Sequence, residues 1–250
     1  MPEATKAAEA AALEDAAEQT ADTAWEFDAA FGAALTSDYI DRGITQTDHG
    51  PALQPYFEPS YGVFYAGVWA SNVDYLTPEP DVEVDLYFGA RPEIGPVSAD
   101  FGYLHYFYPG ASEGNYSEVK AAASISPIEM LTVGGEADYS WDYAQTGDSA
   151  TYLEANAALS LPHDFSLSGA AGVQMFGSDV GLSDYLTWNI GASYVWKAVT
   201  FDLRYHDTDL SSSACGAEYT RSNSCDARIV ATISVDTSWT ALRDRGSASE

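Results

Sequence analysis

Residues 131–143, LTVGGEADYSWDY, alternate strictly between two kinds of side chain. The odd positions hold Leu, Val, Gly, Ala, Tyr, Trp and Tyr, whereas the even positions hold Thr, Gly, Glu, Asp, Ser and Asp. Because successive side chains of a strand point to opposite faces, this pattern predicts a strand with one apolar and one acidic face. The same period of two recurs in residues 82–90, 117–125, 151–161 and 199–206.

Less regular segments raise the expected total to about twelve strands. They cover residues 25–38, 52–60, 63–74, 99–108, 165–176, 185–196 and 227–236. At roughly 9 to 13 residues, most of these segments are longer than the usual strand of a soluble protein and match a tilted crossing of a hydrocarbon layer.

The connections between the segments alternate in length. The joins SYG, SPIE, PHD and KA are tight turns, whereas SDYIDRGITQTDHG, NVDYLTPEP, YPGASEGN, DYAQTGDS, FGSDVGLSD and TDLSSSACGAEYTRSNSCD are long and polar. RPEIGPVSA is the one longer join at the short-turn end. Short turns at one end and long loops at the other are typical of an outer-membrane barrel. The alternative is a soluble sandwich or barrel, which gives no reason for such alternation.

Aromatic residues gather near the strand ends. Trp25, Phe27, Phe64, Phe165 and Trp196 fall near the short turns, and Tyr39, Tyr75, Tyr106, Tyr108, Trp141, Tyr143, Tyr185 and Tyr205 fall toward the long loops. This placement predicts two aromatic girdles at the two membrane interfaces.

The fold that we predict is all-β, a single up-and-down antiparallel transmembrane β-barrel. Residues 24–239 form the barrel, residues 1–23 an Ala- and Glu-rich arm that is helical or disordered, and residues 240–250 a C-terminal tail. No run of about 18 apolar residues predicts a membrane helix. The opening lacks the cationic and apolar regions of a signal peptide, which says nothing against export if such a leader has been removed.

Acidic residues outnumber basic ones by 38 to 10, which gives a net charge of −28. Phosphate binding needs clustered Lys and Arg, so we expect no nucleic-acid partner. Acidity also keeps proteins soluble or suits a salty habitat, and this plainer reading stays open.

If the apolar face meets lipid, the polar face lines the lumen. The predicted lining residues are Glu26, Asp28, Arg42, Glu58, Asp74, Glu83, Asp85, Glu118, Lys120, Glu136, Asp138, Glu154, Asp202, Arg204, His206 and Arg228. Carboxylates in such a space favour cations, share protons or pair with the basic residues. About twelve strands allow either a narrow pore or a plugged polar core.

The segment SDYIDRGITQTDHGPALQP, followed by FYAGVWASNVDY, resembles the TorF family of porins, formerly a conserved hypothetical proteobacterial family. The matching residues are Ser37, Asp38, Tyr39, Arg42, Gly43, Gln46, Pro51, Ala52 and Gln54. The resemblance implies an outer-membrane barrel more firmly than it implies a solute. This chain departs from the pattern in its acidic excess and in its extension beyond Trp239.

Residues 37–50 are then the first long loop, at the extracellular mouth or folded back into it. We expect Arg42 either to hold a rim or lumen carboxylate, which would narrow the pore, or to lie in water. Cys215 and Cys225 share the last long loop, and in an oxidising compartment such a pair predicts a disulfide rather than free thiols or a zinc site.

The function that we predict is a bacterial outer-membrane channel for passive diffusion of small, preferably cationic or neutral solutes. The alternative is a closed barrel with a structural role or a ligand-binding role at the loops. Expected partners are the lipid bilayer, lipopolysaccharide and small solutes or ions, with the oligomeric state left open. We expect no cofactor and no dedicated metal site, although the acidic loops could recruit divalent cations weakly. No nucleophile elbow or zinc-helix pattern predicts an enzyme, and His206, near Arg204 and Asp207, is the best catalytic candidate.

Overall fold

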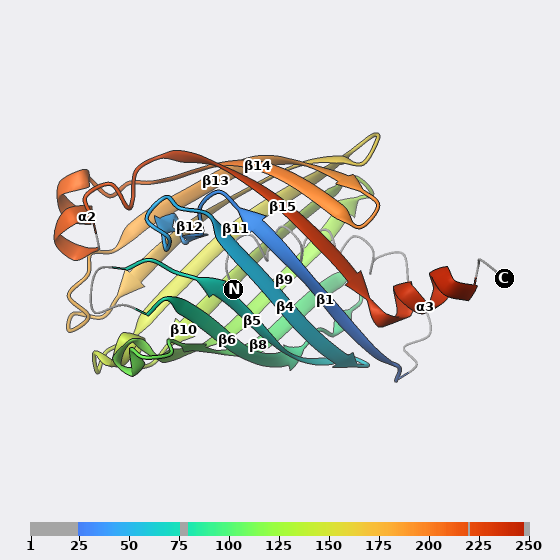
Figure 1. The fold of residues 1–250 in the computed structure, drawn as a ribbon, viewed down its shortest axis with the longest axis horizontal. Helices are drawn as coiled ribbons and strands as arrows, with labels where there is room; N and C mark the ends of the chain where they lie inside the picture. The colour runs from blue at the N-terminus through green and yellow to red at the C-terminus, as the bar shows by residue number, and fades with distance from the viewer. Residues whose placement is uncertain (1–24, 76–79, 220, 248–250) are drawn as a thin grey trace.

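The computed structural model describes residues 25–75, 80–219 and 221–247, so the predicted arm of residues 1–23 lies outside the described part. Twelve long strands carry the fold (Figure 1). They are β1 (Phe27–Thr36), β4 (Ala52–Tyr61), β5 (Phe64–Asn72), β6 (Val82–Ala90), β8 (Val97–Phe107), β9 (Tyr116–Ile128), β10 (Leu131–Ser140), β11 (Ala150–Leu161), β12 (Phe165–Phe176), β13 (Tyr185–Trp196), β14 (Val199–Thr208) and β15 (Arg228–Ser238).

Each long strand pairs with its neighbours in the chain, and the ends meet. β1 pairs with β15 in an antiparallel register that runs from Ala30 opposite Ser238 to Thr36 opposite Thr232. β6 pairs with β8, which completes the ring. Closure leaves no sheet edge, as a membrane-spanning sheet requires. The predicted antiparallel barrel of about twelve strands is confirmed.

Short elements occupy the connections. They are β2 (Ile40–Asp41), β3 (Ile44–Thr45), β7 (Glu93–Ile94), the 3-10 turns η1 (Ser112–Gly114) and η2 (Tyr143–Gln145), and the helix α2 (Ser212–Glu218). Apart from β7, these elements lie at the long-loop end, and tight turns such as residues 129–130 and 197–198 lie at the other end. Loop length therefore alternates as the sequence predicts.

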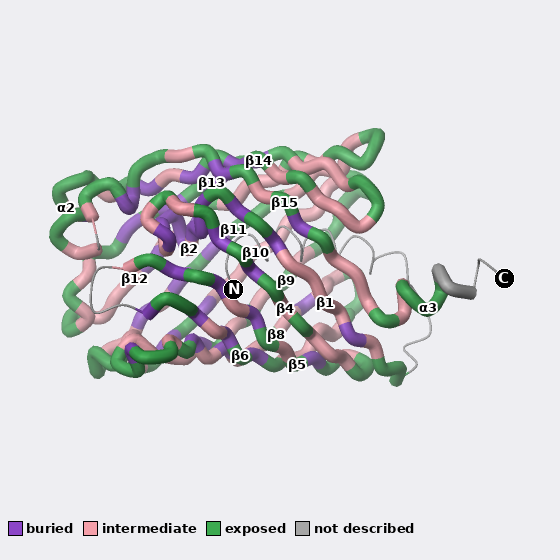
Figure 2. Tube along the Cα trace, in the orientation of Figure 1, coloured by how far each residue is buried: buried purple, intermediate pink, exposed green. Residues whose placement is uncertain are grey.

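Burial alternates along the strands, with the apolar residues outside. In β13, Tyr185, Thr187 and Asn189 are buried, whereas Leu186, Trp188 and Ile190 between them are exposed (Figure 2). A soluble protein would bury the second set. The barrel thus presents its greasy face outward and its polar face inward, as lipid demands.

The last element that the structure describes is the helix α3 (Trp239–Ser247), which follows β15 directly at the short-turn end (Figure 1). The backbone N–H of Thr240 donates to Asp28 Oδ1 at 3.0 Å, which ties the start of α3 to β1. We expected the barrel to extend to Trp239, but this residue begins the helix and is 61% exposed. No helix in the described ranges is long and apolar enough to cross a membrane.

Candidate functional site inside the barrel

The first long loop folds into the barrel as a small hairpin. β2 and β3 pair through Ile40 with Thr45 and through Asp41 with Ile44. The turn between them is Arg42 and Gly43, both in the left-handed region with φ of 46° and 82°. Glycine adopts this region freely, whereas arginine does so at a cost that surrounding contacts must offset. Those contacts are made by the side chain of Arg42.

Arg42 is 7% exposed, and its guanidinium binds three residues on the barrel wall. Nη1 and Nη2 donate to Glu118 Oε1 and Oε2 at 2.9 and 2.8 Å, Nη2 donates to Asp138 Oδ2 at 3.2 Å, and Nη1 donates to Gln174 Oε1 at 3.2 Å. Its carbon Cζ also lies 4.7 Å from the ring centre of Tyr152. These partners belong to β9, β10, β12 and β11. Of the two arrangements that we left open for Arg42, the structure shows the one in which its guanidinium contacts carboxylates of the wall.

Electrostatics keeps Arg42 charged in this setting. Burial by itself lowers the pKa of a guanidinium, but the neighbouring groups, with Glu118 the strongest and Asp138 among them, together outweigh burial and hold the pKa of Arg42 well above its ordinary value. The two-point contact with Glu118 is the geometry that arginine provides and lysine does not.

The base of the hairpin is held by Asp38, which is 6% exposed. Its Oδ1 accepts hydrogen bonds from the hydroxyls of Thr45 and Thr47, and its Oδ2 accepts one from Arg228 Nη1 at 2.7 Å. Arg228 therefore binds the first long loop and does not line the middle of the lumen. At the tip, the Tyr185 hydroxyl donates to the carbonyl of Arg42 at 3.0 Å. The hairpin is fixed at both ends.

A second charged network lies toward the short turns. Lys120 Nζ is 3.3 Å from Asp100 Oδ2 and 3.5 Å from Glu136 Oε2. Arg91 pairs with Glu58 through Nη1 and Oε1 at 2.5 Å, and its Nε is 3.6 Å from Asp100 Oδ2. Two cations and three carboxylates from different strands and turns thus pair along the wall, with one negative charge in excess.

A third group centres on Arg204. Its guanidinium donates to Asn189 Oδ1 at 2.7 Å, to Ser168 Oγ at 2.8 Å and to Asp202 Oδ2 at 3.0 Å. Glu154, 8% exposed, accepts from the Tyr152 hydroxyl at 2.9 Å. His206 is buried on the same face of β14 as Arg204. This side of the lumen is lined by hydrogen-bonded polar groups.

Glu83 and Asp85 lie on the inward face of β6, each 1% exposed. Glu83 accepts hydrogen bonds from the hydroxyls of Tyr39 and Tyr108, both at 2.7 Å. Among the described residues, neither carboxylate oxygen of Asp85 has a hydrogen-bond partner. Burial of a charged carboxylate without hydrogen-bond partners is costly, so Asp85 is an unfavourable element of this wall.

Two cavities divide the lumen, with the Arg42 contacts between them. The outer cavity, of about 240 Å³, is lined by the hairpin and by residues of the long-loop end. The inner cavity, of about 190 Å³, is lined by Arg91, Asp100, Lys120, Glu136, Glu154 and Arg204 among others. A third, very small space of about 10 Å³ is bordered by Glu118, Lys120 and Asp138.

Most of the tyrosines that we expected in the girdle at the long-loop end face the lumen instead. Tyr39, Tyr75, Tyr106, Tyr108, Tyr143 and Tyr185 line the outer cavity, while Trp141 and Tyr205 are exposed. The reason is positional: Tyr106 and Tyr185 fall on the inward set of β8 and β13, and the others lie on loops that turn inward. At the short-turn end, Trp25, Phe27, Phe64, Phe165 and Trp196 are exposed, as a girdle requires.

Two of the expected lining residues lie elsewhere. Glu26 precedes β1 and is exposed, and Asp74 follows β5 and is exposed. We had extended the inward–outward alternation to these two residues, but the strands do not include them. Asp28 sits at the short-turn rim, where it accepts the Thr240 N–H. Conversely, we missed Arg91 and Asp100. Both continue the inward period of two, Arg91 after Gly89 of β6 and Asp100 within β8. The alternation in the sequence therefore predicts that both side chains point inward.

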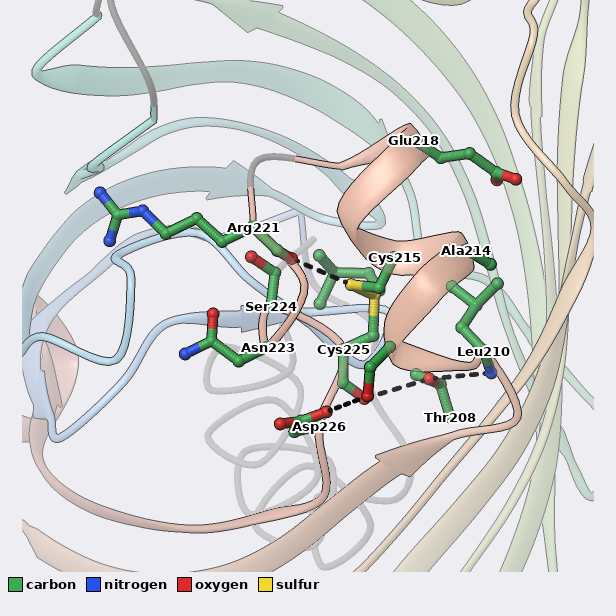
Figure 3. The surroundings of a disulfide bond; sticks show 12 residues. Thr208, Leu210, Ala214, Cys215, Glu218, Arg221, Asn223, Ser224, Cys225 and Asp226 are labelled. Carbon is green, nitrogen blue, oxygen red and sulfur yellow. Dashed lines mark hydrogen bonds between the residues drawn. A yellow bond between two sulfur atoms is a disulfide. The ribbon is translucent and has the colours of Figure 1, made fainter.

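The last long loop carries the predicted disulfide between Cys215 of α2 and Cys225 (Figure 3). Both cysteines are buried and pack with Ile44 of the hairpin and Tyr185 of β13. The backbone N–H of Thr45 donates to the carbonyl of Ser224 at 3.0 Å. The cross-linked loop therefore covers the hairpin from the long-loop side, and the disulfide prediction is confirmed.

A closed antiparallel ring, apolar outside and charged inside, defines an outer-membrane β-barrel of porin-like architecture, which places the protein in a bacterial outer membrane. The chain belongs to the Gcw_chp family, described as bacterial proteins of unknown function, whose model matches residues 18–238. This match supports the family-level resemblance that we inferred, without attaching the name TorF.

Solved structures with the same fold include the KdgM porin, at a TM-score of 0.55 and 9% identity over 83% of this chain and 98% of that one. The KdgM porin in complex with disordered oligogalacturonate matches equally well. A protein from work on the in-meso crystallization of membrane proteins matches at a TM-score of 0.52 and 8% identity over 84% of each chain. No protein of curated function matches by sequence.

Proposed function

We propose that this protein is a narrow outer-membrane channel for passive diffusion of small solutes, with a preference for cationic or neutral ones. The observation that carries the proposal is the charge of the inward face. Its carboxylates are Glu58, Glu83, Asp85, Asp100, Glu118, Glu136, Asp138, Glu154 and Asp202, against the cations Arg42, Arg91, Lys120 and Arg204. Such an excess raises the local concentration of cations and repels anions.

The hairpin with Arg42 at its tip is the constriction in this proposal. It stands between the outer and inner cavities, so a solute passes only where the Arg42 contacts with Glu118 and Asp138 leave room or yield. Permeation is passive, because diffusion along a concentration gradient needs no moving domain. The long-loop end faces the exterior, the apolar outside contacts the bilayer, and lipopolysaccharide surrounds the long loops.

The solute is not carried over from the structural neighbours. One KdgM structure is described with oligogalacturonate, a polyanion, whose passage the carboxylate excess here would oppose. The resemblance to the TorF family of porins supports a channel without naming a solute. Neither resemblance supplies a catalytic role, and we propose none.

A closed barrel with a structural or ligand-binding role at the long loops is the second candidate. It is favoured by the very small space, about 10 Å³, beside Glu118 and Asp138. A space of that size holds roughly one water molecule. A closed barrel would leave the outer cavity as a dead-end pocket.

Planar-bilayer conductance under a salt gradient tests the proposal. We expect discrete steps and a cation-selective reversal potential in the wild type, and a weaker cation preference when Glu136→Gln and Asp138→Asn are combined. Asp164→Asn, in an exposed turn, is the matched control and leaves selectivity unchanged. An unchanged reversal potential in the double variant would contradict the assigned role of these carboxylates. Silence from folded, inserted protein would favour the closed barrel.

A further inference from the structure

The outer cavity is walled by a continuous arc of aromatic rings. Successive ring centres lie 4.3 Å apart from Tyr106 to Tyr116, 4.8 Å to Tyr143 and 5.4 Å to Phe176. The arc continues over 6.4 Å to Tyr185 and 6.2 Å to Tyr219. Strands that are distant in sequence thus contribute to one lining, and all of these rings border the same space of about 240 Å³.

Several of the tyrosine hydroxyl groups that border this cavity are occupied by hydrogen bonds to side chains, whereas the hydroxyl of Tyr219 has no hydrogen-bond partner among the described residues. Tyr39 and Tyr108 donate to Glu83, Tyr106 donates to Glu118 Oε2 at 3.0 Å, and Tyr75 donates to Gln46 Oε1 at 2.6 Å. These bonds hold the four tyrosine rings in place, and their hydroxyl groups are not free to bind a solute. A site built to read the hydroxyls of a sugar would need the opposite arrangement.

Negative charge accompanies the rings. Asp41 and Glu83 border the cavity, and Asp85 lies two residues along the inward face of β6. Arg42 is the cation that borders the cavity within the described ranges, and Glu118 and Asp138 already neutralise it. The potential inside the cavity therefore favours a positive guest.

We propose that the outer cavity is a binding subsite for a small organic cation that carries a quaternary or tertiary ammonium group. The faces of aromatic rings attract cations, and cages of several rings with nearby carboxylates suit alkylated ammonium groups. The volume is below the roughly 300–1,000 Å³ of sites for drug-sized ligands, so the guest is small. The inference deepens and rests on the proposed cation preference of the channel, because it names the class of solute.

Calorimetric titration of the purified full-length protein with choline tests the subsite, and dimethylbutanol serves as the neutral isostere of choline. We expect choline to bind and the isostere to bind at least about tenfold more weakly. Tyr116→Leu removes one ring from the middle of the arc and should raise the Kd for choline about five- to thirtyfold. Glu83→Gln keeps the shape of the side chain, removes its charge and should also raise the Kd.

Tyr139→Leu is the matched control, because Tyr139 is an exposed ring on the outer face of β10. Equal binding of choline and its isostere, tighter binding of a neutral oligosaccharide, or an unchanged Kd in correctly folded Tyr116→Leu would overturn the subsite.

Conductance in potassium chloride separates the two proposals. Cation-selective conductance without choline binding overturns the subsite and keeps the channel. Choline binding by a barrel that does not conduct overturns the channel and makes the cavity the site of a ligand-binding barrel.

Discussion

Arg42 and Glu118, 76 residues apart in the chain, meet through two parallel hydrogen bonds of 2.9 and 2.8 Å between the guanidinium and the carboxylate. One partner lies at the tip of a folded-in loop and the other on the wall. The pair therefore fixes the position of the hairpin relative to the barrel, and the width of the lumen at this level depends on it.

Replacement of Arg42 tests this dependence. Arg42→Ala leaves Glu118 and Asp138 buried without their cation, which typically costs about 3–5 kcal/mol. We expect a lower melting temperature and a larger or noisier single-channel conductance. Arg42→Lys keeps the positive charge but loses the two-point contact with Glu118. Its melting temperature and conductance should therefore lie between those of the wild type and Arg42→Ala. Arg243→Ala, in an exposed pair of α3, is the control. Unchanged conductance and melting in Arg42→Ala would mean that the hairpin is held by its other contacts.

Gly43 tests how closely the tip approaches the wall. A Cβ there would lie 2.5 Å from Thr187 Oγ1 and from Thr208 Cγ2, on a backbone with φ of +82°. Gly147→Ala is the matched control, since its φ is +83° but nothing lies within 4 Å. Both variants bear the cost of the left-handed backbone, about 1 kcal/mol or more, and only Gly43→Ala also bears the clash. In thermal unfolding, the melting temperature of Gly43→Ala should therefore be clearly lower than that of Gly147→Ala. Equal melting temperatures would place the tip away from β13 and β14.

Leu203 tests which face meets lipid. It is 57% exposed on the outer face of β14, between the inward residues Asp202 and Arg204. If residue 203 lies near the bilayer midplane, Leu203→Arg should make the free energy of insertion into vesicles less favourable by about 2–4 kcal/mol. Leu242→Arg, on the exposed part of α3, should insert normally. Normal assembly of Leu203→Arg would mean that the faces are reversed.

Asp148 gives a pH prediction outside the membrane-spanning strands. The backbone N–H groups of Asp179 and Ser149 donate to its carboxylate and hold its pKa below the ordinary value of 3.8. Because the folded pKa is depressed, this contribution to loop stability is present above the unfolded value and is lost as pH falls through the folded one. In NMR titrations, the amide protons of Ser149 and Asp179 should shift together with a midpoint below 3.8, and Asp148→Asn should abolish that transition. A midpoint at or above 3.8 would contradict it.

The period of two and the alternating loop lengths were enough to predict the barrel, because lipid requires both features of a closed sheet. Side-chain direction at strand ends was less predictable. We predicted that Asp74 and Glu26 point inward because we continued the alternation of inward and outward side chains beyond the ends of β5 and β1.

The partners of Arg42 could not be predicted from sequence. Glu118, Asp138 and Gln174 become neighbours only through the register of β9 to β12, which a single sequence does not determine. For the same reason, the sequence could name the tyrosines near the long loops but could not assemble them into one cavity wall.

The contacts of the first long loop also bear on the order in which the barrel folds. Arg42 bonds to a residue 132 positions later, and Asp38 bonds to one 190 positions later. Contacts of such long range form late, because the intervening chain must be ordered first. The pairing of β1 with β15 spans a still longer stretch, from Ala30 to Ser238, so the closing of the wall and the narrowing of the passage both wait for the last strands of the chain.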